Sequence, residues 1–329
     1  MYFSQAQIVN IPDTNFKNAL INEYVVDTNG DGIGDTNADL NNDGEIQLTE
    51  AQAVIGLVLF NSNIASLEGI QSFSNLEYLE CSLNNLTSLN ITQNSNLLTL
   101  KCNDNELTSL DISQSGNLEW LMCGQNQLES IDVSQNPDLK VLYLKQNNLT
   151  FLDVTQNLNL EILNISVNEI TSLDITQNAQ LIKLLCNDND LTSLDVSQNP
   201  NLEDLVIYSN SFSQIDISHN STLRLFYVGS NQLTSIDLTQ NPSLELVSFW
   251  DNQLMEIDFS LNPEITTLDI SSNLLYNLDL TENPNLWSLD CNYNQLVSLN
   301  IKNGANTSLE YLSAYDNPNL NCIQVDDPI

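Results

Sequence analysis

Apolar side chains recur along this chain of 329 residues with a period of 21 positions. Residues 118–137, LEWLMCGQNQLESIDVSQNP, show the pattern: apolar residues at positions 118, 121, 123, 128, 131 and 133, and asparagines at 126 and 136. The opening leucine returns at positions 76, 97, 139, 160, 181, 202, 223, 244 and 286, and an isoleucine takes its place at 265. A fixed period of this size is typical of a solenoid, in which each turn contacts only its neighbours.

Each 21-residue unit divides into two halves. In the half that begins at position 118, the spacing of Leu121 and Cys123 predicts a parallel strand with both side chains inside. The half that begins at Leu128 has a shorter apolar alternation and predicts a second, smaller parallel strand. Asn126 and its equivalents are expected to form an internal ladder, because a buried side-chain amide needs backbone partners at each turn.

The motif LxxLxCxxNxL at positions 118–128 resembles the leucine-rich repeat family, and the resemblance covers roughly four-fifths of the chain. It implies a leucine-rich repeat solenoid: an α/β-type horseshoe that is mostly β, with a parallel sheet on its concave face and short second strands on its convex side. The sequence LEGIQSF at positions 67–73 is similar to the repeats of internalin-type bacterial surface proteins. The stretch that starts at Asn317 resembles leucine-rich repeat proteins of the Bacteroidetes. These likenesses imply an exported adhesion protein, secreted or on the outer-membrane surface of a bacterium.

The chain divides into four expected segments. Residues 1–6 match a signal-peptide remnant, since small residues stand at the −3 and −1 positions that a signal peptidase prefers; an ordinary disordered terminus is the alternative. Residues 7–52 are expected to form a small helical cap over the open apolar end of the first repeat. Residues 53–321 hold about 13 repeat turns. Residues 322–329 begin a C-terminal cap that is cut short, which would make this chain a fragment.

Residues 39–50 match a full EF-hand calcium loop of 12 residues. Its ligand and turn positions are filled by Asp39, Asn41, Asp43, Gly44, the carbonyl of Glu45, and Glu50. Oxygen ligands at alternate positions suit a hard cation that takes six to eight of them. The sequence therefore predicts a calcium site in the cap.

Residues 27–35, DTNGDGIGD, form a second acidic stretch, which lacks the carboxylate at position 12 and resembles the calcium repeats of thrombospondins. The resemblance implies ligands from Asp27, Asn29, Asp31, the Ile33 carbonyl and Asp35, with Asp39 shared. A solvated acidic linker is the alternative for both stretches, but it gives no reason for glycines in register. We expect one or two structural calcium ions, because the clustered carboxylates would repel one another without a cation.

The outward positions of the first half vary from turn to turn, unlike the rest of the repeat. They hold 8 of the 13 tyrosines and tryptophans, although they are only 3 of every 21 positions. A constant scaffold explains variability here, but it does not explain enrichment in the side chains that dominate binding hot spots. We therefore expect a ligand at this face, contacted by Tyr78, Lys101, Trp120, Tyr143, Lys145, Tyr208, Arg224, Tyr227 and Trp250.

These features predict a monomeric, non-enzymatic binding or adhesion protein that recognises a protein or glycan ligand. A glycan-capturing subunit of a nutrient-uptake system is the alternative, since aromatic rings stack on sugars as readily as they anchor proteins. A solenoid that binds ice or mineral is a third hypothesis. The single histidine, His219, replaces a glutamine of the repeat, and we expect no nucleophile beside it and no catalytic role.

The charge balance excludes two classes of partner. Seven lysines and arginines stand against 43 aspartates and glutamates, so the net charge is −36. Nucleic acid and anionic membrane surfaces are excluded, because binding them relies on lysine and arginine. No apolar run is long enough to insert into a membrane.

Two further columns of the repeat carry chemistry. Five of the six cysteines occupy the inward strand position, which predicts buried free thiols, although one bridge within the column that starts at Cys81 is geometrically open. Outward aspartates recur on nine consecutive turns from Asp111 to Asp279. We expect them to accept hydrogen bonds from turn amides; a cation-collecting stripe is the alternative.

Overall fold

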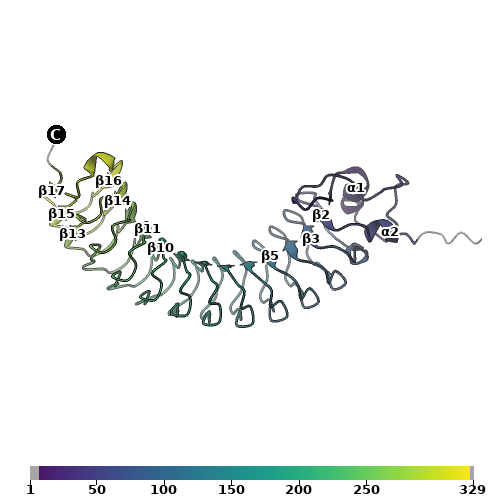
Figure 1. Ribbon diagram of the computed structural model, residues 1–329, viewed down its shortest axis with the longest axis horizontal. Helices are drawn as coiled ribbons and strands as arrows, with labels where there is room; N and C mark the ends of the chain where they lie inside the picture. Colours follow the sequence, from purple (N-terminus) through teal and green to yellow (C-terminus); the bar gives the residue numbers. More distant parts are fainter. Residues whose placement is uncertain (1–6, 327–329) are drawn as a thin grey trace, which may run out of the picture. The chain divides into compact units, whose positions relative to one another are not determined.

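The computed structural model describes residues 7–326 and consists of two compact units, Met1–Asn168 and Glu169–Ile329 (Figure 1). The expected signal-peptide remnant at residues 1–6 lies outside the described residues, as do the last three positions of the expected C-terminal cap. In both units, 21-residue turns stack through parallel strands with few helices. The chain is a leucine-rich repeat solenoid of about 13 turns, which confirms the predicted fold class.

The first unit opens with the cap, where helix α1 (Thr14–Asn22) begins after Asp13. Asp13 Oδ1 accepts hydrogen bonds from the N–H groups two and three residues on, at 2.9 and 3.0 Å, and so satisfies two donors that the first helical turn leaves free. The apolar face of α1 is buried, and the ring of Phe16 lies 6.4 Å from the ring of Phe73 in the repeat region. The helix thereby packs on the first repeat turns.

A short helix, α2 (Leu48–Ala51), and the strand β1 (Val26–Asp27) complete the cap. Strand β1 pairs antiparallel with β2 (Gly56–Val58), the first strand of the repeats. The cap therefore covers the edge of the sheet with one strand of opposite direction, so the outermost repeat does not expose unpaired backbone groups there.

The strands of each unit run in register, and the middle residue of nearly every strand is buried. In the first unit the parallel strands after β2 are β3 (Tyr78–Glu80), β4 (Thr99–Lys101), β5 (Trp120–Met122), β6 (Val141–Tyr143) and β7 (Ile162–Asn164), with a 3-10 turn η1 (Ile70–Ser72). In the second unit they are β8 (Lys183–Leu185), β9 (Asp204–Val206), β10 (Leu225–Tyr227), β11 (Leu246–Ser248), β12 (Thr267–Asp269), β14 (Ser288–Asp290) and β16 (Tyr311–Ser313), with a 3-10 turn η2 (Asn306–Ser308). We call the outward side chains of these strands the strand face, and those of the other half of each turn the turn face.

Second strands on the turn face form at few of the turns, so their prediction for every turn is wrong. Within the described residues they are β13 (Asn277–Asp279), β15 (Ser298–Asn300) and β17 (Ile323–Gln324), which make a three-stranded parallel sheet. In the regular turns an asparagine side chain makes the inter-turn bonds instead: Asn136 Nδ2 donates to two carbonyls of the preceding turn at 3.1 and 2.7 Å. Where that pattern breaks, at Asn303, direct backbone bonds form between the turns.

The ladder predicted from Asn126 is confirmed. Its Nδ2 donates to the Cys102 carbonyl of the preceding turn at 3.0 Å, and its Oδ1 accepts from the N–H of Leu107 at 3.0 Å. The same two bonds recur at the equivalent asparagines, for example at Asn252. Because each amide joins two turns, these buried polar groups stabilise the stacking and remain satisfied.

Candidate functional site

The two acidic stretches of the cap fold in the same way. In each, the carboxylate at position 1 accepts a hydrogen bond from the glycine N–H at position 6: Asp27 from Gly32 at 2.8 Å, and Asp39 from Gly44 at 2.9 Å. Position 3 then accepts from position 5, and position 5 from position 7, at 2.8 to 2.9 Å in both loops. The two glycines have φ near +80°, which only glycine adopts without strain, so their register in the sequence has a structural reason.

Three of the loop carboxylates are buried without a cationic partner. Asp27, Asp39 and Glu50 are 4, 4 and 7% exposed. Glu50 reaches back over its loop, where it accepts from the N–H of Leu40 at 2.9 Å and of Gln47 at 2.9 Å. Within residues 7–326 none of the salt bridges involves these three carboxylates, and Lys17 pairs instead with Glu45 at 2.7 Å.

The donor chemistry of both loops fits a hard cation. The donors are carboxylate, amide and carbonyl oxygens, which calcium prefers. As the side chains stand, no three acidic, histidine or cysteine groups among the described residues come close enough to hold a metal. Asp35, an expected ligand, instead accepts from the Thr28 hydroxyl at 2.8 Å. An ionised carboxylate has about four lone-pair sites, so a group that accepts one or two of these hydrogen bonds keeps lone pairs for a cation.

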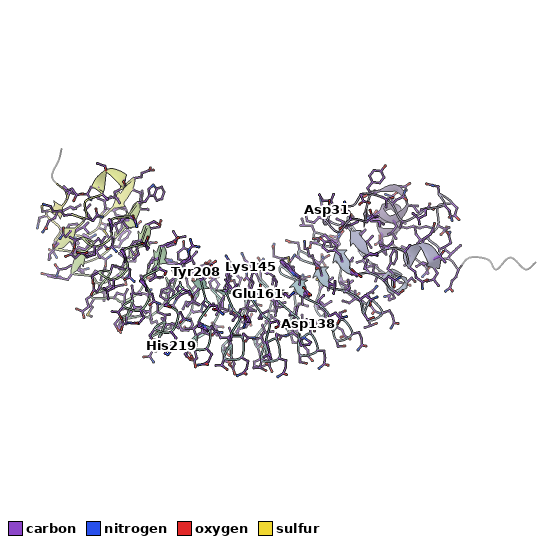
Figure 2. The ribbon with its side chains drawn as sticks, in the orientation of Figure 1. Asp31, Asp138, Lys145, Glu161, Tyr208 and His219 are labelled. Atoms are coloured by element: carbon purple, nitrogen blue, oxygen red, sulfur yellow. The ribbon has the colours of Figure 1, made fainter. Side chains whose placement is uncertain are left out.

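The first loop is attached directly to the strand face. Its position 1, Asp27, lies opposite Gly56 in the sheet, and a Cβ on Gly56 would fall 3.0 Å from the Asp27 Cβ. Gly32 of the same loop lies beside the hydroxyl of Tyr78 on strand β3. Figure 2 shows Asp31 of this loop at the cap end of the first unit. The first loop therefore lies next to the strand-face residue Tyr78.

The first unit presents five of the predicted ligand-contacting residues, and the structure joins two of them. Lys101 donates to the Tyr78 hydroxyl at 3.1 Å and lies 5.2 Å from the ring centre. Trp120 is 41% exposed and Tyr143 is half-buried on the neighbouring strand. Lys145 is exposed and takes part in none of the salt bridges of the described residues (Figure 2).

The second unit gathers three of the predicted aromatic residues around one cleft. Tyr208, Tyr227 and Trp250 come from three successive turns and line a cavity of about 330 Å³ on the strand face (Figure 2, Tyr208). Burial and the charge of a neighbouring aspartate raise the pKa of both tyrosines above its usual value: Asp188 acts on Tyr208 and Asp204 on Tyr227. The cleft is therefore aromatic in its walls and negative in its surroundings.

A glycine makes this arrangement possible. Gly229 stands between Tyr208 and Trp250 in the same column of the repeat, and a Cβ on it would overlap the indole ring of Trp250. Because the glycine has no side chain, the indole lies against the backbone of the preceding turn. The cleft thus depends on the order of three residues spaced 21 positions apart: the aromatic Tyr208, then Gly229, then the aromatic Trp250.

Four lining residues were not predicted as sites. They are Val247, Ser248, Thr267 and Asp269. Ser248, Thr267 and Asp269 occupy outward strand positions, but only aromatic and basic residues at such positions were predicted to contact a ligand. The sequence did contain an indication of the role of Gly229. Residues 208, 229 and 250 occupy the same position of three successive repeats, and the middle one is a glycine between two aromatic residues.

The predicted cation of this unit is already engaged. Arg224 binds Glu245 through two parallel hydrogen bonds of 2.9 Å each. Lys183, on strand β8, lies 2.6 Å from the Asp204 carboxylate. Both pairs span successive turns, so they stabilise the stacking and reduce the positive charge that the strand face offers to a ligand.

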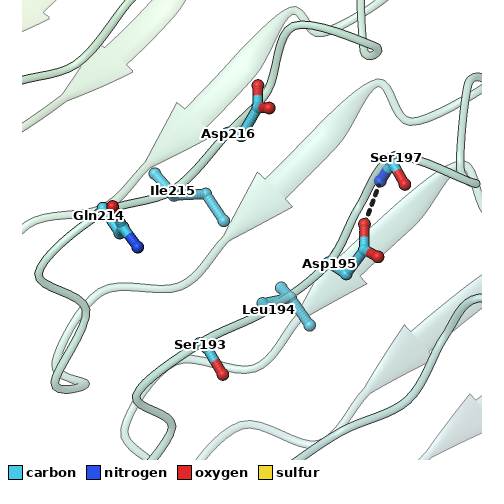
Figure 3. A pocket seen from close by; sticks show the side chains of 7 residues that line it. All are labelled: Ser193, Leu194, Asp195, Ser197, Gln214, Ile215 and Asp216. Atoms are coloured by element: carbon cyan, nitrogen blue, oxygen red, sulfur yellow. Dashed lines mark hydrogen bonds between the residues drawn. The ribbon is translucent and has the colours of Figure 1, made fainter.

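The aspartate column of the turn face follows its expected role. Asp195 Oδ1 accepts from the Ser197 N–H at 2.9 Å (Figure 3). The same bond to the residue two positions on is present from Asp111 to Asp279, for example at Asp132 and Asp216. The hydroxyl and N–H of Ser197 hold the pKa of Asp195 below its usual value. The groove of about 360 Å³ beside Asp195 recurs in another turn, at Asp132, so it is a consequence of the repeat.

His219 lies on the turn face, away from the aromatic cleft (Figure 2). Contrary to the expectation that no nucleophile lies beside it, the Ser218 hydroxyl is 3.1 Å from its Nδ1. Asp216, however, accepts from the Ser218 N–H at 2.9 Å. A nucleophile and base also require a third group that orients the imidazole, and the hydrogen bond of Asp216 goes to the Ser218 backbone rather than to the ring.

The cysteines behave as the pattern predicts. Cys81, Cys102, Cys123, Cys186 and Cys291 are fully buried free thiols, and Cys322 is exposed. Burial raises the pKa of Cys186 and of Cys291 to about 12. No helix among the described residues has the length and apolar character needed to cross a membrane.

Comparisons with known proteins connect this geometry to solved structures. No family model matches the sequence, and no curated protein matches it. The functional domain of InlJ from Listeria monocytogenes, described as including a cysteine ladder, is 31% identical with a TM-score of 0.81, over 98% of this chain and 77% of that one. A leucine-rich repeat protein of Leptospira interrogans is 26% identical with a TM-score of 0.75, and the match covers 85% of this chain and 79% of that one. The internalin InlF of Listeria monocytogenes is 20% identical with a TM-score of 0.80, and the match covers 100% of this chain and 99% of that one. It shares the fold.

Proposed function

Because the chain belongs to the internalin family of leucine-rich repeat proteins, we propose that it is a non-enzymatic protein that binds a protein ligand. The observation that carries the proposal is the cleft of Tyr208, Tyr227 and Trp250. Tyrosine and tryptophan in a partly enclosed cleft are the residues on which binding energy concentrates. The parallel strands hold them on a regular scaffold, which favours recognition over chemistry.

The location proposed for the protein is outside the cell, secreted or on a bacterial surface. The support is its likeness to internalins, together with a surface whose net charge of −36 excludes nucleic acid as a partner. The exposed, unsupported histidine favours a role without catalysis. The aspartates of the turn face each accept a hydrogen bond from their own turn, which accounts for their repetition as part of the scaffold without an ice or mineral surface.

A selection experiment tests the binding function. A random peptide library is selected on the full chain and, in parallel, on the Trp250→Ala variant. We expect peptides enriched on the wild type and lost on the variant, because the indole is one wall of the cleft. Trp287→Ala is the matched control, since Trp287 is 49% exposed in the same unit and does not line the cleft.

Two results would contradict this proposal. One is the absence of any enrichment on the wild type, and the other is enrichment that Trp250→Ala leaves unchanged. Binding on a glycan array that is lost on Trp250→Ala would favour the glycan-capturing alternative, because an aromatic wall also stacks on sugar rings.

We further propose that the cap binds one or two calcium ions with a structural role. Three observations support it: the hydrogen-bond pattern common to both loops, their oxygen donors, and the buried carboxylates of Asp27, Asp39 and Glu50 without cationic partners. A bound ion would offset the repulsion among these groups. Ligand that is present at 100 times its dissociation constant stabilises a fold by about 2.7 kcal/mol, so the effect on unfolding would be measurable.

Calorimetric titration of chelator-treated protein tests the metal and its stoichiometry. We expect heat on addition of calcium, a higher melting temperature, and loss of one ion in Glu50→Gln. Glu106→Gln is the matched control, because Glu106 is an exposed glutamate of the repeats outside the cap. An unchanged melting temperature after chelation would overturn the proposal.

A further inference from the structure

The charges around the aromatic cleft of the second unit indicate which kind of chemical group the cleft can bind. This inference rests on the binding function proposed above. Asp269 lines the cleft together with Tyr208, Tyr227 and Trp250. It lies on strand β12, in register with Asp290 on strand β14. Two carboxylates therefore stand on successive strands at one side of the aromatic walls.

These two carboxylates lack a compensating positive charge. Of the three lysines and arginines after residue 168, Lys183 pairs with Asp204 and Arg224 with Glu245. Within the described part of the second unit, none of the salt bridges involves Asp269 or Asp290. Asp269 and Asp290 occupy matched positions on neighbouring strands, where two like charges repel one another. Burial, and after it the charge of Asp269, raise the pKa of Asp290 above its usual value. A cation placed here would remove that repulsion.

The aromatic walls favour the same kind of group. The faces of tyrosine and tryptophan rings attract cations, and the attraction is strongest for tryptophan. A guanidinium group is flat, so it stacks on an indole while its N–H groups donate to a carboxylate. The cavity of about 330 Å³ is near the lower end of ligand clefts, which run from about 300 to 1,000 Å³, and suits one long side chain.

We propose that this cleft binds a basic side chain, arginine or lysine, on an extended segment of the protein ligand. The cation lies between Trp250 and Asp269, with Tyr208 and Tyr227 as the remaining walls. A neutral or acidic side chain would leave the Asp269 and Asp290 pair uncompensated, so the cleft discriminates by charge as well as by shape.

Three matched peptides test the charge requirement on the full chain. Each has the same neutral glycine–serine sequence, with arginine, lysine or citrulline at the centre, and binding is followed by the change in tryptophan fluorescence. Citrulline keeps the shape of arginine and removes its charge. We expect arginine to bind at least about tenfold more tightly than citrulline, with lysine between them, because a charged donor to a carboxylate is worth more than a neutral one.

Variants assign the effect to the cleft. Asp269→Asn is expected to bring the affinity for the arginine peptide to that for the citrulline peptide. The matched control is Asp279→Asn, which removes an exposed carboxylate from the turn face of the same unit. Arginine binding should also weaken as salt is raised.

The outcomes separate this inference from the binding function beneath it. If arginine and citrulline bind equally, or if Asp269→Asn has no effect, the charge requirement is wrong. If library peptides without basic residues bind in a Trp250-dependent way, the result supports the binding function and contradicts the inference that the cleft selects a basic side chain. If neither the matched peptides nor the library peptides bind in a Trp250-dependent way, both are overturned.

Discussion

The indole ring of Trp250 lies against the backbone of Gly229, in the space that a Cβ on residue 229 would occupy. The two residues are 21 positions apart and therefore adjacent in the stack. This contact sets where the tryptophan wall of the cleft stands. It makes Gly229 a positioning residue whose role can be separated from any contact with the ligand.

Replacing Gly229 by alanine should displace Trp250. We expect Gly229→Ala to lose Trp250-dependent peptide binding, and to unfold more easily by about 1–3 kcal/mol because an added methyl group overpacks the site. Near-ultraviolet circular dichroism of the tryptophans and denaturant unfolding measure the two effects. Gly116→Ala is the control, since the nearest atom to its added Cβ would be 3.6 Å away, an ordinary contact. Normal binding by Gly229→Ala would contradict the positioning role.

Ser115 interrupts the buried asparagine column of the turn face. Asn94 and Asn136 each donate to two carbonyls of the preceding turn and leave only their Oδ1 without a partner, whereas the buried Ser115 hydroxyl makes neither of these bonds. Ser115→Asn should restore two bonds, to the carbonyls of residues 91 and 94, and stabilise the fold by about 1 kcal/mol. The denaturant midpoint measures it, with Ser95→Asn at an exposed position as the control. A lower midpoint for Ser115→Asn would show that this turn cannot accommodate the amide.

The aspartate column of the turn face should make the free energy of unfolding depend on pH in the acidic range. The hydroxyl and N–H of Ser197 lower the pKa of Asp195 in the folded state, so the fold favours the ionised carboxylate. Its contribution is therefore present above the unfolded pKa of about 3.9 and is lost as pH falls through the lower folded pKa. We expect Asp195→Asn to be less stable than wild type at pH 7 and the difference to shrink below about pH 4. A difference that is constant from pH 7 to pH 2 would rule this out.

Of the six cysteine thiols, the five buried ones should be unreactive in the folded protein, and the exposed Cys322 should react. Burial raises the pKa of Cys186 and Cys291 to about 12, which suppresses the reactive thiolate, and Cys322 is exposed. Iodoacetamide at pH 8 should modify one site in the folded protein and six after denaturation, as counted by mass spectrometry. In Cys322→Ser the folded chain should take up no label. Rapid modification of Cys123 in the folded chain would contradict the burial of this column.

Most of the fold could be predicted because the repeat places each residue type at a fixed point of the turn. The partners of Asn126 and the burial of Cys123 follow from their column positions, and the structure shows both. The second strands could not be predicted from the same pattern. Whether that half of a turn pairs through its backbone depends on which group makes the inter-turn bonds, Asn136 in a regular turn or the backbone near Asn303.

The candidate site was predicted in part. Tyr208, Tyr227 and Trp250 were identified from their outward columns, and the structure brings them to one cleft. The same columns gave no indication that Arg224 is bound by Glu245, because residue spacing does not show which acid on a neighbouring turn a flexible side chain will meet. The calcium loops remain a prediction, supported by the hydrogen-bond pattern that they share.

The stacking of turns, the buried columns and the variable outward positions all follow from the repeat, since a strict period fixes which side chains face the interior of every turn. The tertiary structure decided what those outward positions make together. A cleft needs side chains from several turns to meet, and their meeting depends on side-chain directions and on the absence of a side chain at Gly229. The charge of that cleft was likewise decided by pairing: Lys183 and Arg224 bind acids of adjacent turns, and Asp269 is left beside the aromatic walls.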